Sequence, residues 1–393
     1  MVARPAIEGG KPVRRHLLPY GHQRITRADV QAVAAALRGE WITQGPLVDR
    51  FERALARRCR AKHAVAMSSG TAALHAACAV AGLRSGTDGI TTPITFAASA
   101  NAIVYCGARP RFIDVAEDWP LVDVEALENA AAPAARVVVP VDYGGHPAPL
   151  DEIRRIAAAR GWSVIEDAAH ALGGTYKDKP VGAISDMTVF SFHPVKQITT
   201  GEGGAVITND RAFAEALRSF RHHGIVKPAG RAPWFYDIPR PGHNFRLTDF
   251  QCALGLRQLE ELSTRVSRRR AFAARYTKAF RALAGLDPPL ERPGCRSAYH
   301  IYPIRLRPQE LKVGRRRVFE ALHAEGLGVQ VHYIPAHLLA FYRSAYGHKE
   351  GDYPRAEAFY DREITLPLFD GMSDRDADDV IEATTKVLAY YAR

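Results

Sequence analysis

Long hydrophobic runs are missing from this 393-residue sequence, and none approaches the roughly 20 residues that a membrane span requires. The N-terminal stretch MVARPAIEGGKPVRRHLLPYG also lacks an apolar core long enough for a signal peptide. We therefore expect a cytoplasmic protein with no membrane partner.

Cysteine is scarce, and the cysteines are scattered along the chain. The chain has five cysteines, and none of them forms a C-x-x-C pair: Cys59, Cys78, Cys106, Cys252 and Cys295. Neither a disulfide framework nor a zinc site is indicated, and we expect no metal. Most of these thiols are expected to be reduced core residues.

Basic residues outnumber acidic ones, 53 to 42, which gives a formal net charge of +11 and makes an anionic partner plausible. Nucleic acid and a phosphorylated small molecule are both candidates. Two basic runs, RVSRRR (265–270) and GRRRVF (314–319), are expected to form solvated helix faces rather than a binding stripe. Zinc-finger spacing and an aromatic RNA-binding signature are both missing, so we expect no nucleic-acid partner.

From about residue 62 the chain alternates short apolar runs with segments of helical pattern. Examples are HAVAMSS before TAALHAACAVAG, and ARVVVPVDY before LDEIRRIAAARG. This alternation predicts a mostly parallel sheet with helices on both faces, whose ligands bind at the carboxyl ends of the strands. A long helix is predicted over about 248–283.

After the proline-rich stretch at 288–293 the pattern changes to a smaller α+β region. A strand is predicted at 298–306, a helix at 314–326 and another strand at 329–335. We expect a large domain over 1–255, including an N-terminal arm, and a smaller C-terminal domain over 256–393 that includes the end of the long helix.

Three motifs at predicted strand ends carry the chemistry. The first, SSGTAAL (68–74), places small residues at the start of a helix, where free N–H groups suit a phosphate. An ordinary N-cap would have the same sequence. The second, VIEDAAHA (164–171), places Asp167 after an apolar strand and His170 three residues later. A buried carboxylate needs a cation, either in a salt bridge or on a protonated heterocycle.

The third motif, SFHPVKQITTGEGG (191–204), places Lys196 between a strand and a glycine cluster. An imine-forming lysine belongs in a cationic or dry pocket. The glycines would let the backbone lie close to a bound ring, although a hairpin or bulge would also explain them. Ser191, near the end of the preceding strand, could join a phosphate site.

In this order the three motifs match the requirements of pyridoxal 5′-phosphate (PLP): a phosphate cradle, an aspartate for the pyridine nitrogen and a lysine that forms a Schiff base. Phe96, which follows another strand, would stack on the cofactor ring; a plain core aromatic is the alternative reading.

The chain resembles the DegT/StrS-type aminotransferases, fold-type I PLP enzymes that act on nucleotide-linked keto sugars. The resemblance runs from PYGHQRIT (19–26) to ITLPLF (364–369). Within the family it is strongest to the branch that aminates UDP-linked 4-keto sugars for pseudaminic acid biosynthesis, through SFHPVKQITTGEGGAV, GHNFRLTDFQCALGL and VQVHYIP. It implies an α/β fold: a large αβα domain with a mostly parallel sheet and a smaller C-terminal α+β domain.

The resemblance also implies roles for individual residues. Lys196 would hold PLP and move a proton, Asp167 would pair with the ring nitrogen, and His170 would lie near the 3-hydroxyl group. Gly70, Thr71 and Ser191 would bind the phosphate. Asn244 would reach the phosphate of the neighbouring subunit's cofactor, which implies a homodimer with shared active sites. The substrate positions would be Tyr20, Glu40, Trp41, Ile42, Thr43 and Tyr333.

The implied reaction is a transamination in which L-glutamate donates the amino group and a 4-keto sugar nucleotide accepts it. A sugar 3-dehydratase of the same fold is disfavoured, because those relatives have histidine where this chain has Lys196. Aminotransferases acting on a dTDP-keto sugar or a keto-cyclitol remain open. A nucleic-acid-binding or regulatory protein on the same scaffold is the alternative from another class.

Overall fold

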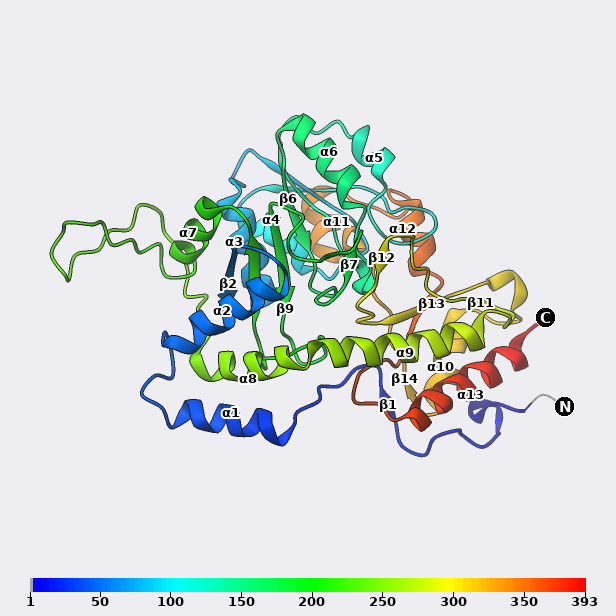
Figure 1. The fold of residues 1–393 in the computed structure, drawn as a ribbon. Coiled ribbons are helices and arrows are strands. Elements are labelled where there is room, and N and C mark those ends of the chain that lie inside the picture. The colour runs from blue at the N-terminus through cyan, green and yellow to red at the C-terminus, as the bar shows by residue number, and fades with distance from the viewer. Residues whose placement is uncertain (1–2) are drawn as a thin grey trace.

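The computed structural model describes residues 3–393, and Figure 1 shows their arrangement. The large sheet has seven strands in the order β2-β10-β9-β6-β5-β3-β4. Only β10 is antiparallel to its neighbours, so the predicted mostly parallel sheet is confirmed. The strands are β2 (His63–Met67), β3 (Asp88–Thr91), β4 (Arg109–Phe112), β5 (Ala135–Val139), β6 (Ser163–Asp167), β9 (Met187–Ser191) and β10 (Gly204–Thr208).

Helices cover both faces of this sheet because alternate strand residues point to opposite sides. Along β2, Val65 and Met67 join one buried cluster, while Ala64 and Ala66 join another. The first cluster is covered by α3 (Gly70–Val80), α4 (Ala98–Tyr105) and α7 (Arg211–Phe220). The opposite face is covered by α2 (Pro46–Arg58), α5 (Val124–Glu128), α6 (Leu150–Arg160) and α8 (Asp249–Glu260).

The C-terminal part contains a three-stranded antiparallel sheet in the order β11-β13-β15. Its elements are β11 (Leu286–Asp287), β13 (Tyr302–Leu306), β15 (Glu363–Leu366), α9 (Leu262–Phe280), α10 (Arg315–Ala324) and α13 (Asp374–Tyr391). On β15, Ile364 and Leu366 belong to the apolar core that these helices cover. Glu363 and Thr365 are offset by one residue and therefore lie on the other face of the strand.

Shorter elements connect these layers or lie at their edges. They are η1 (Ala6–Glu8), β1 (Leu18–Pro19), α1 (Arg27–Leu37), η2 (Tyr143–Gly145), β7 (Thr175–Tyr176), β8 (Lys179–Pro180), β12 (Cys295–Arg296), η3 (Pro308–Glu310), β14 (Leu327–Gly328), η4 (Ala336–Leu338), α11 (Ala340–Tyr346) and α12 (Pro354–Tyr360). Within residues 3–393, no helix combines the length and apolar character that crossing a bilayer would require.

Two predictions about elements need correction. The strand predicted over 329–335 is wrong: only Gln330 pairs, in an isolated bridge to Thr365, and the following residues leave the sheet edge. The predicted long helix is divided at Glu261 into α8 and α9. The predicted domain boundary at residue 255 falls inside α8, and the division into two domains stays a prediction.

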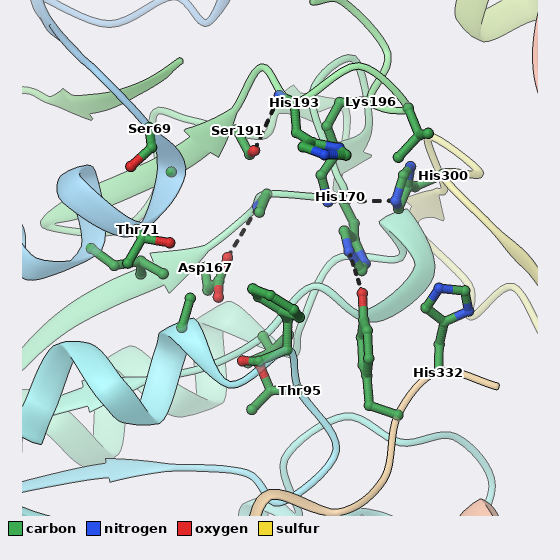
Figure 2. Close-up of a pocket in the computed structure, with 18 of the residues that line it drawn as sticks. Ser69, Thr71, Thr95, Asp167, His170, Ser191, His193, Lys196, His300 and His332 are labelled. Carbon is green, nitrogen blue, oxygen red and sulfur yellow. Dashed lines mark hydrogen bonds between the residues drawn. The ribbon is translucent and has the colours of Figure 1, made fainter. Parts of the chain in front are cut away.

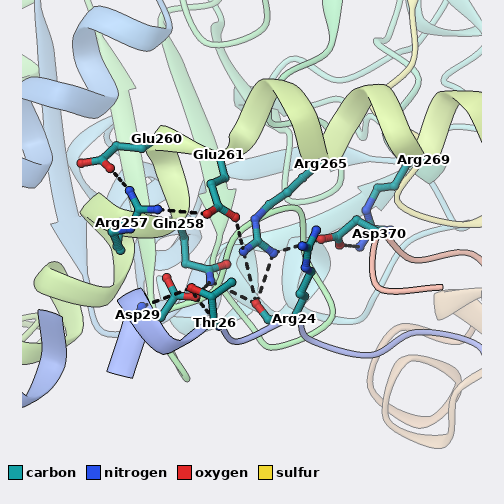
Figure 3. A network of polar contacts seen from close by, with 10 residues as sticks. All are labelled: Arg24, Thr26, Asp29, Arg257, Gln258, Glu260, Glu261, Arg265, Arg269 and Asp370. Carbon is teal, nitrogen blue, oxygen red and sulfur yellow. Dashed lines mark hydrogen bonds and ion pairs between the residues drawn. The ribbon is translucent and has the colours of Figure 1, made fainter. Parts of the chain in front are cut away.

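The basic run at 265–270 is not a solvated helix face, contrary to expectation. Arg265 and Arg269 are almost fully buried, and both pair with Asp370, at 3.0 and 3.5 Å (Figure 3). Arg265 also donates to the carbonyl oxygen of Arg24 in the N-terminal arm. Arginine is seldom buried unless it is paired, so a basic run in a helical pattern is normally interpreted as a solvated face. The sequence does not show the pairing with Asp370.

Candidate active site

The carboxyl ends of β2, β9 and β6 meet at one edge of the large sheet, where they open onto a cavity of about 440 Å³ (Figure 2). Nine of the predicted site residues line it: Tyr20, Gly70, Thr71, Phe96, Asp167, His170, Ser191, Lys196 and Tyr333. The sheet order therefore brings together motifs that lie up to about 130 residues apart in the sequence, from Gly70 to Ser191 and Lys196.

Asp167 is the last residue of β6 and is buried at the wall of the cavity. Its Oδ2 accepts a hydrogen bond from Ser99 Oγ at 2.5 Å, and its Oδ1 accepts one from the Ala169 amide at 3.1 Å. Burial raises the pKa of Asp167, and these two bonds and the charge of Lys196 oppose the rise. All its hydrogen-bond donors within residues 3–393 are neutral, so a cationic ligand group would satisfy this carboxylate.

Lys196 lies beyond the end of β9 and projects toward the same cavity. Burial lowers the pKa of Lys196 to about 7; the charge of Asp167 opposes this shift and that of Arg269 adds to it. Its Nζ lies 3.4 Å from Nε2 of His300. An amine with such a pKa is about half neutral at pH 7, and the neutral form is the nucleophile that imine formation requires.

Arg269 holds the backbone on both sides of the lysine pocket. Its guanidinium donates to the carbonyl oxygens of Val195, at 3.3 Å, and of His300, at 3.1 Å. Through its pairing with Asp370, the buried arginine junction thus fixes the chain next to Lys196.

His170 and Tyr333 form a hydrogen-bonded pair across the cavity. His170 Nδ1 accepts from the Gly144 amide at 3.3 Å, and Nε2 lies 3.1 Å from the Tyr333 hydroxyl. Burial lowers the pKa of His170 well below its usual range, with Lys196 and His332 adding to the shift. A neutral imidazole that accepts at Nδ1 carries its proton on Nε2, so His170 donates to Tyr333 and leaves the phenol hydrogen free for a ligand.

The start of α3 forms an anion cradle beside Ser191. Ser69 caps the helix by accepting from the Ala72 amide at 3.0 Å, and within the described chain the amides of Gly70 and Thr71 have no hydrogen-bond acceptor. A Cβ at Gly70 would lie 2.9 Å from Ser191 Cβ, and one at Gly204 would lie 2.6 Å from the Ser69 backbone. Gly204 therefore allows the loop at Ser69 to lie close to strand β10. We had expected the glycines after Lys196 to let the backbone lie close to a bound ring.

Five predicted residues lie outside the cavity of their own chain. Asn244 is exposed and pairs with His222 in an isolated bridge. Glu40, Trp41, Ile42 and Thr43 are exposed between α1 and α2, and the Ile42 carbonyl accepts from the Asp249 amide at 3.0 Å. A single chain does not bring these residues to Lys196.

Several polar residues of the site were not predicted, among them Ser99, His300 and His332. Ser99 is fully buried and donates to Asp167, and His300 and His332 line the cavity. Ser99 sits in the helical pattern FAASAN, where a serine is unremarkable. The two histidines lie in segments read as strands, SAYHIYP and VQVHYIP, so only their position in three dimensions identifies them.

Comparison with known proteins adds the family. Residues 23–385 match the DegT/DnrJ/EryC1/StrS aminotransferase family. The chain is 39% identical over 381 residues to the spore coat polysaccharide biosynthesis protein SpsC of Bacillus subtilis, covering 95% of this chain and 98% of that one. It is 37% identical over 376 residues to the UDP-4-amino-4,6-dideoxy-N-acetyl-beta-L-altrosamine transaminase of Campylobacter jejuni, with coverage of 95% and 98%.

Solved structures agree with these matches. Helicobacter pylori PseC, an aminotransferase involved in the biosynthesis of pseudoaminic acid, superposes with a TM-score of 0.89 at 31% identity, covering 95% of this chain and 100% of that one. The PLP form of the sugar aminotransferase Spr1654 from Streptococcus pneumoniae gives the same TM-score and identity, with coverage of 95% and 99%. Aminotransferases of this family use PLP.

The residues of this cavity fit PLP on three structural observations. The free amides at Gly70 and Thr71 and the Ser191 hydroxyl suit the phosphate. Asp167 lacks the cation that a protonated pyridine nitrogen would supply. Phe96 is 62% exposed at the cavity wall, which leaves its ring face free to stack on an aromatic ligand.

Proposed function

Since the chain belongs to the DegT/DnrJ/EryC1/StrS aminotransferase family and is a PLP-dependent sugar aminotransferase, we propose that it aminates a UDP-linked 4-keto sugar. The proposed acceptor is of the UDP-2-acetamido-2,6-dideoxy-4-hexulose type, in amino-sugar biosynthesis of the pseudaminic acid kind. L-glutamate is the proposed donor. The observation that carries the chemistry is the convergence of Lys196, Asp167 and the free amides of α3 on one cavity.

PLP, when bound, supplies a carbonyl group that takes up the amino group and a ring that accepts the electrons of a breaking Cα–H bond. The chain supplies the rest. Asp167 would stabilise a proton on the ring nitrogen, and Ser99 holds its carboxylate in place. Lys196 would hold the cofactor and, as a neutral amine, would be the base that carries a proton. The Tyr333 hydroxyl, held by His170, would be free to donate to an oxygen of the bound cofactor.

We also propose that the working unit is a homodimer. The arm at 222–245 leaves the body of the molecule between α7 and α8 (Figure 1), and four large apolar residues on it are exposed: Trp234 (82%), Tyr236 (55%), Ile238 (46%) and Phe235 (40%). An exposed apolar set of this size is typical of an interface. Asn244, at the base of the arm, lies outside its own cavity, which leaves it available to a second copy.

The proposed compartment is the cytoplasm. All five cysteines are free, and three of them are buried, as expected in a reducing environment.

The substrate is tested by screening UDP- and dTDP-linked 4-keto sugars with L-glutamate and following the cofactor absorbance in each half-reaction. We expect glutamate to discharge the PLP absorbance and a UDP-4-keto sugar to restore it. Faster restoration by a dTDP-keto sugar or a keto-cyclitol would overturn the UDP assignment while leaving the chemistry intact; the similarity to SpsC makes other polysaccharide precursors worth including.

The shared site is tested by mixing two inactive variants, Lys196→Ala and Asn244→Asp, after mild denaturation and refolding. Asn244→Asp places a carboxylate against a phosphate dianion, and the two repel. In a heterodimer, one site combines the intact lysine with the intact asparagine. Random mixing makes about half the dimers mixed, so about a quarter of wild-type activity should return. Heterodimers that form but remain inactive would contradict a role of Asn244 across the interface.

A further inference from the structure

A chain of buried hydrogen bonds runs from β15 to the cavity through residues that the proposed reaction does not use. Thr365 Oγ1 lies 2.5 Å from Glu363 Oε1 and 2.8 Å from His332 Nδ1. The other carboxyl oxygen, Glu363 Oε2, accepts from the His332 backbone amide at 2.8 Å. His332 lines the cavity beside Tyr20, with ring centroids 5.3 Å apart.

The strand geometry explains why these groups meet. Glu363 and Thr365 are two residues apart on β15, on the face opposite the apolar core, and both are fully buried. Reciprocal backbone bonds with Gln330, at 2.8 and 3.1 Å, fix Thr365, and the Tyr143 hydroxyl donates to the His332 carbonyl at 2.5 Å. The three side chains are therefore held rigidly, as a relay requires.

Glu363 has no cation in contact. Among the ion pairs of residues 3–393, none includes Glu363, and its only donors are a hydroxyl and a backbone amide. An ionised carboxylate without a cationic partner is costly in a fully buried position, so the neutral acid is favoured. Because Oε2 already accepts from the amide, the acid proton belongs on Oε1, facing Thr365.

We propose that Glu363 keeps this proton and that Thr365 transmits its state to His332, so that His332 presents Nε2–H to the cavity as a hydrogen-bond donor. The acid donates to Thr365 Oγ1, the single hydroxyl hydrogen then donates to Nδ1, and the imidazole proton lies on Nε2. Loss of the Glu363 proton reverses both bonds, moves the imidazole proton to Nδ1 and leaves Nε2 as an acceptor. Glu363 and Thr365 are thus positioning residues for His332.

A donor at this place suits an acceptor substrate that carries a carbonyl oxygen, and this part of the inference rests on the proposed function. Within the described chain Nε2 of His332 has no hydrogen-bond partner, although it borders the cavity. A ligand oxygen would satisfy it.

The charged and titratable neighbours support a neutral relay. Burial raises the pKa of Glu363 to about 8; its two hydrogen bonds and the Arg315 guanidinium oppose the rise. Burial lowers the pKa of His332 to about 3, with Lys196 adding to the shift. Tyr143, Tyr333 and Tyr20, which face this cluster, have pKa values raised by burial and remain neutral. Glu363 is therefore the group in the relay that titrates near neutral pH.

The direct test is the tautomer of His332, read from the ¹⁵N shifts of histidine-labelled holoenzyme and assigned with His332→Gln. We expect Nε2–H at pH 6.5 and conversion to Nδ1–H as the pH rises through about 8. Glu363→Gln, whose amide donates to Thr365 as the acid does, should hold Nε2–H across the range. Thr365→Val should abolish the coupling, and Thr365→Ser should restore it.

Kinetics provide the second readout. Loss of an aligned hydrogen-bond donor commonly weakens binding about 3- to 10-fold. Thr365→Val should therefore raise KM for the keto sugar by that factor and leave the rate of the glutamate half-reaction within about 2-fold of wild type. Thr384→Val is the matched control, since Thr384 is equally buried and its hydroxyl has no partner within residues 3–393.

A His332 tautomer that Thr365→Val leaves unchanged, with the same pH response, would overturn the relay. If Thr365→Val does not fold, the pH response of the wild type against that of Glu363→Gln decides the same point. The tautomer is read without substrate, so failure of every UDP-keto sugar would reject the proposed function and leave the relay to be judged by its spectra.

Discussion

Two buried carboxylates, in two regions of the molecule, have opposite surroundings. Asp370, at the arginine junction, is 3% exposed and pairs with Arg265 and Arg269 (Figure 3). Asp167, at the cavity, is 6% exposed and receives only neutral hydrogen bonds. The chain neutralises Asp370 by itself and leaves Asp167 to be neutralised by a ligand. On the proposed assignment, the contrast separates a carboxylate that stabilises the fold from one that would bind the cofactor.

The largest expected effect comes from removing the charge at the cavity. Asp167→Asn should leave PLP bound but lower the transamination rate by on the order of 10²–10⁴, because the proton on the ring nitrogen loses its counter-charge. The apoenzyme should not lose stability, since the substitution removes an uncompensated buried charge. Steady-state rates and melting of the apoenzyme check both parts; activity within about threefold of wild type would contradict the assignment.

At the junction the same substitution should act on stability instead. Asp370→Asn leaves buried Arg269 without a counter-charge and leaves Arg265 only its pair with Glu261, and breaking a buried pair commonly costs about 3–5 kcal/mol. Urea unfolding of the two proteins measures the difference. Asp374→Asn is the control, because its pair with Arg275 is exposed and should contribute less than about 1 kcal/mol. Equal midpoints for Asp370→Asn and wild type would show that Asp370 does not hold the junction.

A smaller effect is expected behind Asp167. Ser99→Ala removes the 2.5 Å hydrogen bond to Oδ2 and should lower the rate about 10-fold, in line with a bond to a charged group. Thr95→Val removes the 2.6 Å contact to Ser99 Oγ and the 3.1 Å bond to the Phe96 carbonyl but leaves both bonds to Asp167, so it should have a weaker effect. The order of the two rates is the test, and Thr95→Val as the slower enzyme would contradict it.

The smallest effect is a shift in a pH profile. The neutral amine of Lys196 reacts with PLP, so the rate of PLP capture by apoenzyme should rise with pH and level off above a midpoint of about 7. Asp167 raises the pKa of Lys196, so Asp167→Asn should move the midpoint lower. Stopped-flow absorbance measures the profile. A midpoint near 10, as for an exposed lysine, would show that burial does not activate Lys196.

The sequence predicted the site residues that directly follow strands of the parallel sheet. Lys196, Asp167 and the start of α3 lie at the ends of apolar strands, so their meeting follows from a parallel sheet. His332 and its support were not predictable in this way, because Glu363 and Thr365 reach it from a separate sheet. The buried arginines were misread since a basic helix face looks the same whether it meets water or Asp370. Asn244 and the segment from Glu40 to Thr43 were expected at the site from the resemblance alone; a single chain does not bring them there, and their roles stay predictions.

Lys196 and Asp167 are proposed to form the PLP site of a sugar aminotransferase, and covalent labelling shows which lysine holds the cofactor. Borohydride reduction of the purified holoenzyme, followed by proteolysis and mass spectrometry, identifies the residue that holds the cofactor. We expect a pyridoxyl group on Lys196 and no labelling in Lys196→Ala. A pyridoxyl group on any other lysine of the wild-type enzyme would overturn the assignment of Lys196.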